Sequence, residues 1–185
     1  MADLILDGTS IISKTGSTVT YGAGTLGTDV VFPAGHIVSH ATPYYDPSVP
    51  STIETNQTSF QESGVEVSLT TKFSGSNSRI VCQFFSGYMR MSGNSAICYW
   101  TVGRGTGTGT AYSSATDLSD NTWNTVFYPD ATGAYWSQGG LWVDTTHSAS
   151  TTYYYQIYFR SNSGTTQLVR SDASVALNVY EVRIS

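Results

Sequence analysis

Charged side chains are scarce in this sequence. They make up 11% of its 185 residues, against roughly 25% in an average globular chain. Only Lys14 and Lys72 are lysines, and the eight basic residues lie scattered along a chain whose net charge is −5. Proteins that bind nucleic acid by neutralising its phosphates need a clustered basic surface. The composition therefore argues against nucleic acid as a partner.

Long apolar runs are missing as well. No segment has the ~18 consecutive apolar residues of a membrane-spanning helix. The start of the chain, Met1-Ala2-Asp3, lacks the basic and apolar segments of a signal peptide. We expect a chain that neither inserts into a membrane nor is exported by a signal peptide.

Cysteine occurs only twice, at Cys82 and Cys98. The sequence Ser92–Ser95 is typical of a hairpin turn, which would place Cys98 opposite Met89. Cys82 would then lie roughly 24 Å away at ~3.4 Å per residue, beyond the ~7 Å within which two Cα atoms can be bridged. We predict two free, buried thiols, as expected of a protein that folds in a reducing cytoplasm.

An apolar stripe of helical period is absent from the whole sequence, and turn signals recur roughly every 8 to 12 residues, as in β-sandwiches. Aromatic residues reach 13%, and the abundance of Thr, Tyr, Val and Gly fits short strands and turns. These features predict an all-β fold: an antiparallel β-sandwich, jelly-roll-like, over residues 32–185.

Alternating apolar residues place the strands of this body. Phe32–His40 begins with a turn and continues as a strand, and three prolines then predict a surface loop that carries Tyr44 and Tyr45. Residues 133–140 are expected to form an exposed aromatic tip. The remaining strands before residue 150 are predicted by an inward row at Val65, Val67 and Leu69, a second row at Ile80, Cys82 and Phe84, and the segments 97–102, 121–128 and 141–143.

Residues 1–31 differ from the body. Short apolar patches alternate there with Gly, Ser and Thr, and such patches cannot form a core without neighbours. We interpret this segment as a short N-terminal arm that packs on the body or attaches to a partner. An edge hairpin of the main domain is the alternative.

The last third of the chain, Thr151 to Ser185, reads as consecutive strands with apolar or aromatic residues on both faces. One face of a half-buried sheet should be polar, so we infer that the outer face meets a second layer, a ligand or a partner subunit. The candidate subunit-interface residues are Tyr154, Tyr158, Tyr180 and Val182.

Catalytic patterns are hard to find. His36 and His40 would lie about 13 Å apart along a strand, at ~3.3 Å per residue, so they cannot share a metal within one chain, although a three-fold axis could gather one His from each subunit. The glycines at 103–109 lack the ending of a phosphate loop, and no G-x-S-x-G motif is present. His147 lies near Asp144 and several serines, which we attribute to chance. We expect no enzyme activity, no cofactor and no metal.

Four stretches carry a family resemblance: FPAGHIVSH, TSFQESGVEVSLTTKFSGSNSRIVCQFFSG, GLWVDTTHSASTTYYYQIYFRSNSGTT and VALNVYEVRIS. As an ordered set they resemble a module of virion structural and tail-fibre proteins of tailed bacteriophages, of the aquatic and cyanobacterial type. The resemblance covers most of residues 32–185. It implies a β-sandwich, commonly trimeric, on the outside of a virion that is assembled in the host cytoplasm, with residues 1–31 joining capsid or tail proteins.

Long fibres place such a module after an extended shaft, whereas only about 30 residues precede it here. The resemblance therefore implies either a short fibre that recognises host-surface glycans or a capsid decoration protein. For a glycan, which stacks on aromatic faces, the candidates are Trp123, Tyr135, Trp136 and Trp142, although a core role is the alternative for each. A carbohydrate-binding module and a polysaccharide depolymerase, using Asp117, Asp120, Asp130 or Asp144, are the remaining rivals.

Overall fold

The chain forms two compact units in a computed structural model, Met1–Phe32 and Pro33–Ser185. The structure describes residues 2–6, 9–15, 18–21, 34–41, 44–46, 52–91, 97–119, 125–127, 135–169 and 174–185. Trp123, which the sequence proposes as a binding residue, lies outside these ranges.

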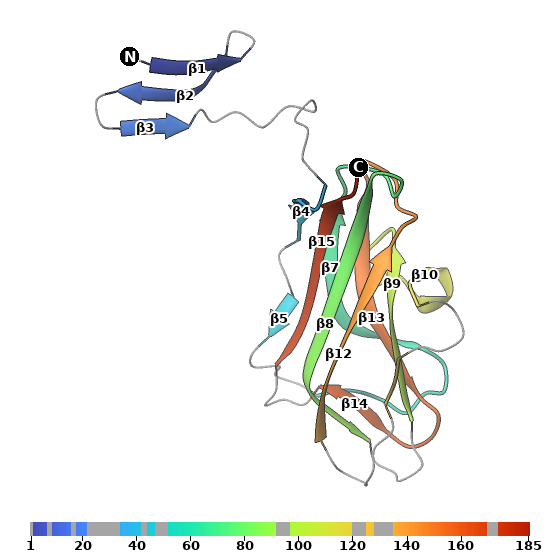
Figure 1. Cartoon of the computed structure of the whole chain (residues 1–185). Coiled ribbons are helices and arrows are strands. Elements are labelled where there is room, and N and C mark those ends of the chain that lie inside the picture. The colour runs from blue at the N-terminus through green and yellow to red at the C-terminus, as the bar shows by residue number, and fades with distance from the viewer. Residues whose placement is uncertain are drawn as a thin grey trace. The chain divides into compact units, whose positions relative to one another are not determined.

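The first unit is a three-stranded antiparallel sheet (Figure 1). Its strands β1 (Ala2–Leu6), β2 (Thr9–Thr15) and β3 (Thr18–Tyr21) form from the short apolar patches of the predicted arm. Strand β2 pairs with both neighbours. The attachment role of residues 1–31 stays a prediction.

The second unit is a sandwich of two antiparallel sheets (Figure 1), which confirms the predicted fold class. The five-stranded sheet has the order β10-β9-β13-β7, with β11 beside β9; the seven-stranded sheet has the order β4-β15-β8-β14-β6, with β12 beside β8 and β5 beside β15. The strands of the five-stranded sheet are β7 (Gln61–Thr70), β9 (Cys98–Gly105), β10 (Thr116–Asp117), β11 (Thr125–Phe127) and β13 (Thr152–Ser161). Those of the seven-stranded sheet are β4 (Ile37–His40), β5 (Tyr44–Asp46), β6 (Ile53–Thr55), β8 (Ser78–Met91), β12 (Tyr135–Asp144), β14 (Thr166–Val169) and β15 (Val175–Arg183).

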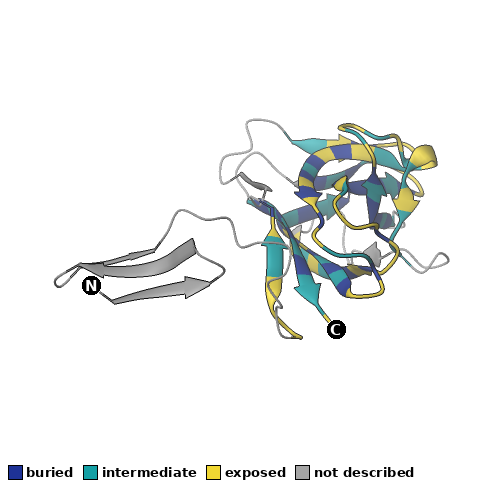
Figure 2. Cartoon of the chain, turned by 90° about the horizontal axis from the view of Figure 1, so that it is seen from above, coloured by how far each residue is buried: buried dark blue, intermediate teal, exposed yellow. Residues whose placement is uncertain are grey.

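Alternation of side chains builds the interface between the sheets. Because successive strand residues point to opposite faces, the predicted rows of β7 and β8 are buried while their neighbours are more exposed. Figure 2, which looks down on the body from above, shows buried residues alternating with more exposed ones along the ribbons. One helical turn, η1 (Tyr112–Ser114), is the only helix in the described part of the chain.

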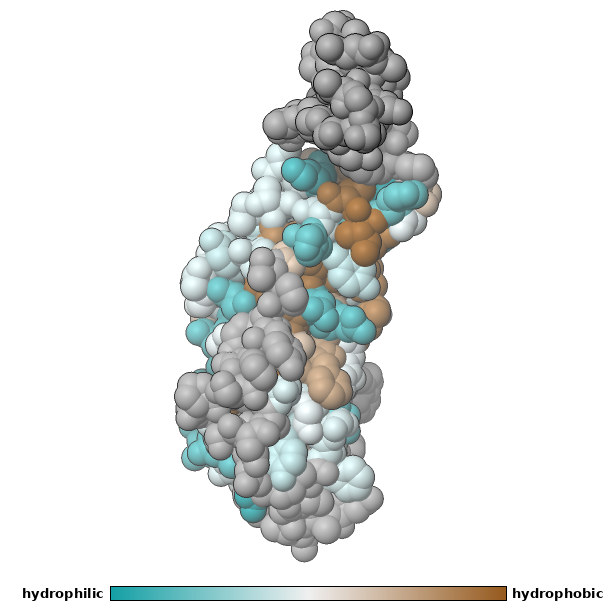
Figure 3. Space-filling view, turned by 90° about the vertical axis from the view of Figure 1, so that its left-hand side faces the viewer, coloured by the Kyte–Doolittle hydropathy of each residue, from teal (hydrophilic) through white to brown (hydrophobic). Residues whose placement is uncertain are grey.

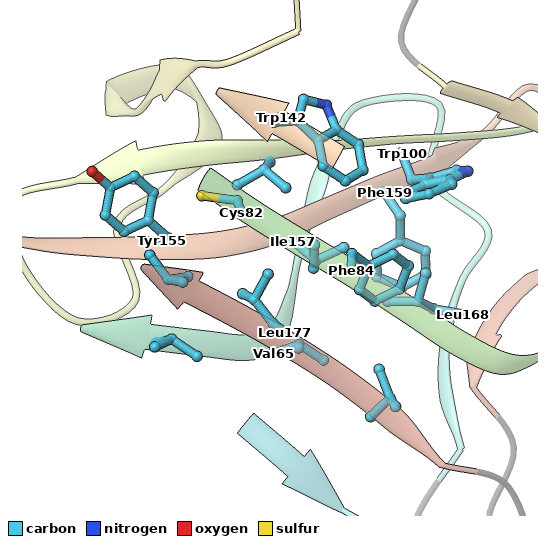
Figure 4. Close-up of a cluster of buried hydrophobic side chains, with 14 of the residues drawn as sticks. Val65, Cys82, Phe84, Trp100, Trp142, Tyr155, Ile157, Phe159, Leu168 and Leu177 are labelled. Atoms are coloured by element: carbon cyan, nitrogen blue, oxygen red, sulfur yellow. The ribbon is translucent and has the colours of Figure 1, made fainter. Parts of the chain in front are cut away.

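Three large aromatic rings connect the two sheets at the centre of the core (Figure 4). The ring of Trp100 on β9 lies 4.9 Å from that of Phe84 on β8 and 5.1 Å from that of Trp142 on β12. Since Trp100 belongs to one sheet and its two partners to the other, these contacts hold the layers together.

The pairing of the strands differs from the predicted hairpin. Cys98 was expected opposite Met89, but β8 and β9 lie in different sheets, so Cys98 pairs with Ser161 and Phe127 instead. The chain thus crosses between sheets after Met91. Both thiols are free and buried, as predicted.

The prediction of an exposed aromatic tip at residues 133–140 is also wrong for the part that the structure describes, residues 135–140. Residues from Tyr135 onward belong to β12, a ten-residue strand that pairs along most of β8. Within this strand Gly139 and Gly140 lie opposite Phe85 and Phe84, and the missing side chain of Gly140 leaves room for the Trp142 and Trp100 rings.

Candidate functional site

The predicted glycan-binding aromatics do not form one cluster. Trp142 is 7% exposed and packs in the core, so its selection as a binding residue is wrong. Trp136 is 37% exposed on β12, opposite Met89. The backbone of Tyr135 lies beside it in β12, and the side chain of Tyr135 falls outside the described residues.

The four predicted interface residues lie on different sheets. Tyr180 and Val182 are half-buried on the outer face of β15, and Tyr154 is half-buried on β13. Tyr158 is fully buried, because its ring lies over Gly103 and meets the Tyr112 ring at 5.4 Å, and its hydroxyl donates to the Thr110 carbonyl. The chain itself covers Tyr158, so its assignment to a subunit interface is wrong.

Asp144 is the centre of a buried polar cluster at the end of β12. Its carboxylate accepts hydrogen bonds from the Arg104 guanidinium at 2.6 Å, the Tyr155 hydroxyl at 3.0 Å and the Thr146 N–H at 2.9 Å. Burial alone would raise the pKa of Asp144, but these donors together hold that pKa below its ordinary value. An ionised carboxylate, both of whose oxygens accept hydrogen bonds, therefore holds the end of β12 in place.

A second buried carboxylate belongs to Glu181 on β15. It accepts hydrogen bonds from the backbone N–H groups of Lys72 and Phe73 at 2.6 and 2.8 Å and from the Ser78 hydroxyl at 2.7 Å. These bonds hold residues 71–77, where the chain passes from β7 in one sheet to β8 in the other. The role of Glu181 is therefore to fix this crossing.

His147 contacts Ser78, and the geometry argues against catalysis. The two side chains lie 2.9 Å apart, between the His147 Nε2 and the Ser78 Oγ. Because the Ser78 hydroxyl donates to Glu181, the Nε2 must carry the proton that completes the contact with Ser78. A base that already holds this proton cannot accept one from Ser78, and both residues are buried.

A groove on the other sheet offers a surface for a ligand. It has a volume of about 510 Å³ and is lined by Ser59, Phe60, Gln61, Glu62, Ala111, Tyr112 and Ser113. The rings of Phe60 and Tyr112, both in its lining, contact each other with 4.5 Å between their centroids. We call this the Phe60–Tyr112 groove.

Neighbouring residues fix the two rings. The Tyr112 hydroxyl donates to Asp117 at 2.7 Å, and Asp117 also accepts from the Thr101 hydroxyl on β9. Burial and the Asp117 carboxylate raise the pKa of Tyr112 to about 12, so this hydroxyl stays a donor. The Arg160 guanidinium lies 5.2 Å from the centroid of Phe60. The aromatic part of the groove is thus formed before any ligand arrives.

Polar groups surround these rings. Ser59, Glu62 and Ser113 are exposed, and the Gln61 amide donates to Ser59. Half-buried aromatic carbon beside hydroxyl, amide and carboxylate oxygens suits a polyhydroxylated ligand with apolar C–H faces. The sequence analysis missed this site because Phe60 and Tyr112 lie 52 positions apart, and only their turn-like surroundings mark them.

Within the described ranges, no group of three or more His, Cys, Asp and Glu side chains is placed to hold a metal ion. In the same part of the chain, no helix has the length and apolar character needed to cross a bilayer.

No protein-family model matches the sequence, and no curated protein matches it. Among solved structures, the chain is similar to one in the structure of infectious bursal disease virus Gt strain, with a TM-score of 0.36 and 13% identity over 92% of this chain and 40% of that one. It is also similar to the CBM22-1 xylan-binding domain of Paenibacillus barcinonensis Xyn10C, with a TM-score of 0.28 and 13% identity over 84% of this chain and 99% of that one. This chain thus spans less than half of the viral chain.

Proposed function

We propose that this chain is a non-enzymatic structural protein of the virion surface of a tailed bacteriophage, a homotrimeric short fibre that recognises glycans on the host. In this proposal residues 1–31 attach the protein to capsid or tail proteins, and the sandwich points outward. The observation that supports recognition is the Phe60–Tyr112 groove, which presents aromatic carbon and exposed polar groups on a rigid sheet.

A glycan suits the groove better than an ionic or wholly apolar ligand. Sugar rings offer C–H faces to aromatic carbon and hydroxyls to polar side chains, and both kinds of surface meet here. Exposed Glu62 can accept hydrogen bonds from sugar hydroxyls, and Ser113 can donate or accept. Because Asp117 fixes the Tyr112 ring, binding costs little side-chain entropy.

The hydrogen bonds and burial of the candidate catalytic side chains support a protein that is not an enzyme. Asp117 and Asp144, two of the carboxylates that a depolymerase would use, are occupied by several hydrogen bonds each. The other two, Asp120 and Asp130, lie outside the described residues. Ser78 and His147 are buried in the Glu181 network.

Glycan binding is tested with purified full-length protein on surface polysaccharide from the host or on a glycan array. Phe60→Ala and Glu62→Gln should each weaken binding by roughly tenfold or more if they contact the ligand. The control is Ser68→Ala, an exposed position of β7 outside the groove. Equal binding by all four proteins would reject the groove as the glycan site.

A capsid decoration protein is the second candidate, supported by the apolar outer side of the seven-stranded sheet, which suits a protein partner. Ile37 and Leu141 there are each about 60% exposed. Electron microscopy of particles labelled with antibody against this chain separates the two candidates. Label at fibre tips supports host recognition, label over the shell supports decoration, and unlabelled particles would reject both.

A further inference from the structure

Large exposed apolar side chains gather on one surface of the body. Among the described residues, six such side chains are more than a third exposed, and five lie on or next to the outer face of the seven-stranded sheet: Ile37, Phe85, Leu141, Val143 and Ile184. Figure 3 shows hydrophobic residues grouped on the side of the body where β4 and β15 lie. We call the outer face of β4, β15, β8 and β12 the apolar face.

Strand register brings these residues together. Opposed residues of antiparallel neighbours share a face, so Val143, Val81 and Tyr180 form one row across three strands. Another row places Gly139, Phe85 and Ala176 side by side four residues further along β8. The half-buried Val182 lies opposite Ile37 at the other end.

Between those rows lies a mixed row, in which the apolar Leu141 stands beside the polar Gln83 and Asn178. No charged side chain belongs to these three rows. Arg79, at one end of the face, donates to the carbonyls of Gly75 and Ser78. Arg79 keeps its positive charge there, so only the three central rows are uncharged, on a chain whose net charge is −5.

The exposed apolar area of this face is large for a monomer. At about 100 Å² each, the five exposed side chains present on the order of 500 Å² of apolar surface, which is in the upper part of the range for the largest patch of a monomer. The half-buried neighbours add to this, and a standard interface needs roughly 800 Å² from each partner. A sheet face of this size is costly to leave in water.

We propose that a second copy of this chain covers the apolar face, with three copies packing these faces around a common axis. This inference rests on the proposed homotrimer and names its interface. Two acidic copies repel each other least where both surfaces lack charge, as in the three central rows, and the Gln83 and Asn178 amides can pair with amides of a neighbouring copy because each carries donors and acceptors. Around a three-fold axis the same face of every subunit points inward, which leaves the Phe60–Tyr112 groove, on the other sheet, open.

The oligomeric mass of the full-length protein tests this interface. Sedimentation of the wild-type chain should give about three times 19.9 kDa, and Leu141→Glu and Phe85→Ser should each raise the dissociation constant of the trimer by tenfold or more. Ser68→Glu, on the outer face of the other sheet, is the matched control. Circular dichroism confirms that each variant is folded.

A cross-linking experiment gives an independent readout. The two native cysteines are buried, so Gln83→Cys adds one accessible thiol at the centre of the apolar face. A short bis-maleimide should join copies of Gln83→Cys and leave Ser68→Cys as single chains.

The outcomes separate this interface from the trimer itself. A wild-type trimer that Leu141→Glu and Phe85→Ser do not weaken would place the interface elsewhere and leave the proposed function intact. A wild-type monomer would reject both the interface and the homotrimer. A monomer that binds particles, and loses that binding with Leu141→Glu, would assign the face to another virion protein and overturn the inference.

Discussion

The ring of Trp142 meets the ring of Trp100 edge-on, with an interplanar angle of 70° and 5.1 Å between centroids. This contact joins β12 to β9 and hence one sheet to the other. It depends on Gly140, two residues before Trp142, because a Cβ atom there would lie 2.6 Å from the Trp142 ring and 3.0 Å from the Trp100 ring.

Gly140→Ala is therefore expected to destabilise the sandwich. The added methyl group would force the two indole rings apart, and overpacking of this kind costs about 1–3 kcal/mol. Urea unfolding followed by tryptophan fluorescence measures the change. Gly107→Ala is the control, because a Cβ atom at Gly107 would meet nothing within 4 Å. Equal stability of the two variants would contradict a tightly packed Trp100–Trp142 contact.

The sequence predicted where the strands lie better than it predicted which strands pair with each other. The alternation in β7, β8 and β15 is visible in the residue order and confirmed by burial, whereas β13 is buried on both faces from Tyr155 to Phe159. Alternation identifies the inward face of a strand, but it does not identify the sheet that the strand joins. For this reason the turn signal after Met91 suggested a hairpin, although the chain crosses between sheets there.

The sequence also does not show which aromatic residues lie in the core and which lie at the surface, where a ligand could bind. Trp142 and Trp136 look alike in sequence, yet one lies in the core and the other is partly exposed. Phe60 and Tyr112 meet only because a loop after β9 folds over the outer face of the five-stranded sheet, where it also buries Tyr158. A contact made by a loop leaves no periodic pattern in the residue order.

Replacing Glu181 with Gln should destabilise the crossing between the sheets. The Glu181 carboxylate accepts two backbone N–H groups and the Ser78 hydroxyl, and an amide would turn an N–H₂ group toward one of these donors. Leaving buried groups unsatisfied costs about 1–3 kcal/mol, measurable by urea unfolding. Glu62→Gln, at an exposed position, should change stability by less than about 0.5 kcal/mol. A stable Glu181→Gln variant would mean that the loop 71–77 is held by other contacts.

Acidification should lower the stability of the body in two stages. Burial lowers the pKa of His147 in the folded protein, although the nearby Asp144 and Glu181 carboxylates act in the opposite direction. The pKa of Asp144 is also lowered, because its carboxylate accepts hydrogen bonds from several donors. The unfolded chain therefore takes up protons first, and stability falls as pH falls. The His147 contribution is lost below the ordinary value of 6.5, and that of Asp144 below 3.8.

Thermal unfolding between about pH 8 and pH 5 isolates the first stage, because only histidine ordinarily titrates in that range. His147→Gln should flatten the decline in melting temperature there, whereas His40→Gln, at an exposed position, should keep it. An unchanged decline in His147→Gln would assign the pH dependence to another group.

The two cysteines should resist thiol reagents as long as the protein is folded. Burial raises the pKa of Cys82 well above its ordinary value and that of Cys98 to about 12, so almost no reactive thiolate forms near neutral pH. Ellman's reagent is expected to detect no thiol in native protein and two per chain in guanidinium. Rapid reaction of one thiol in native protein would mean that its strand opens locally, and mass spectrometry of the labelled peptide would show whether β8 or β9 does so.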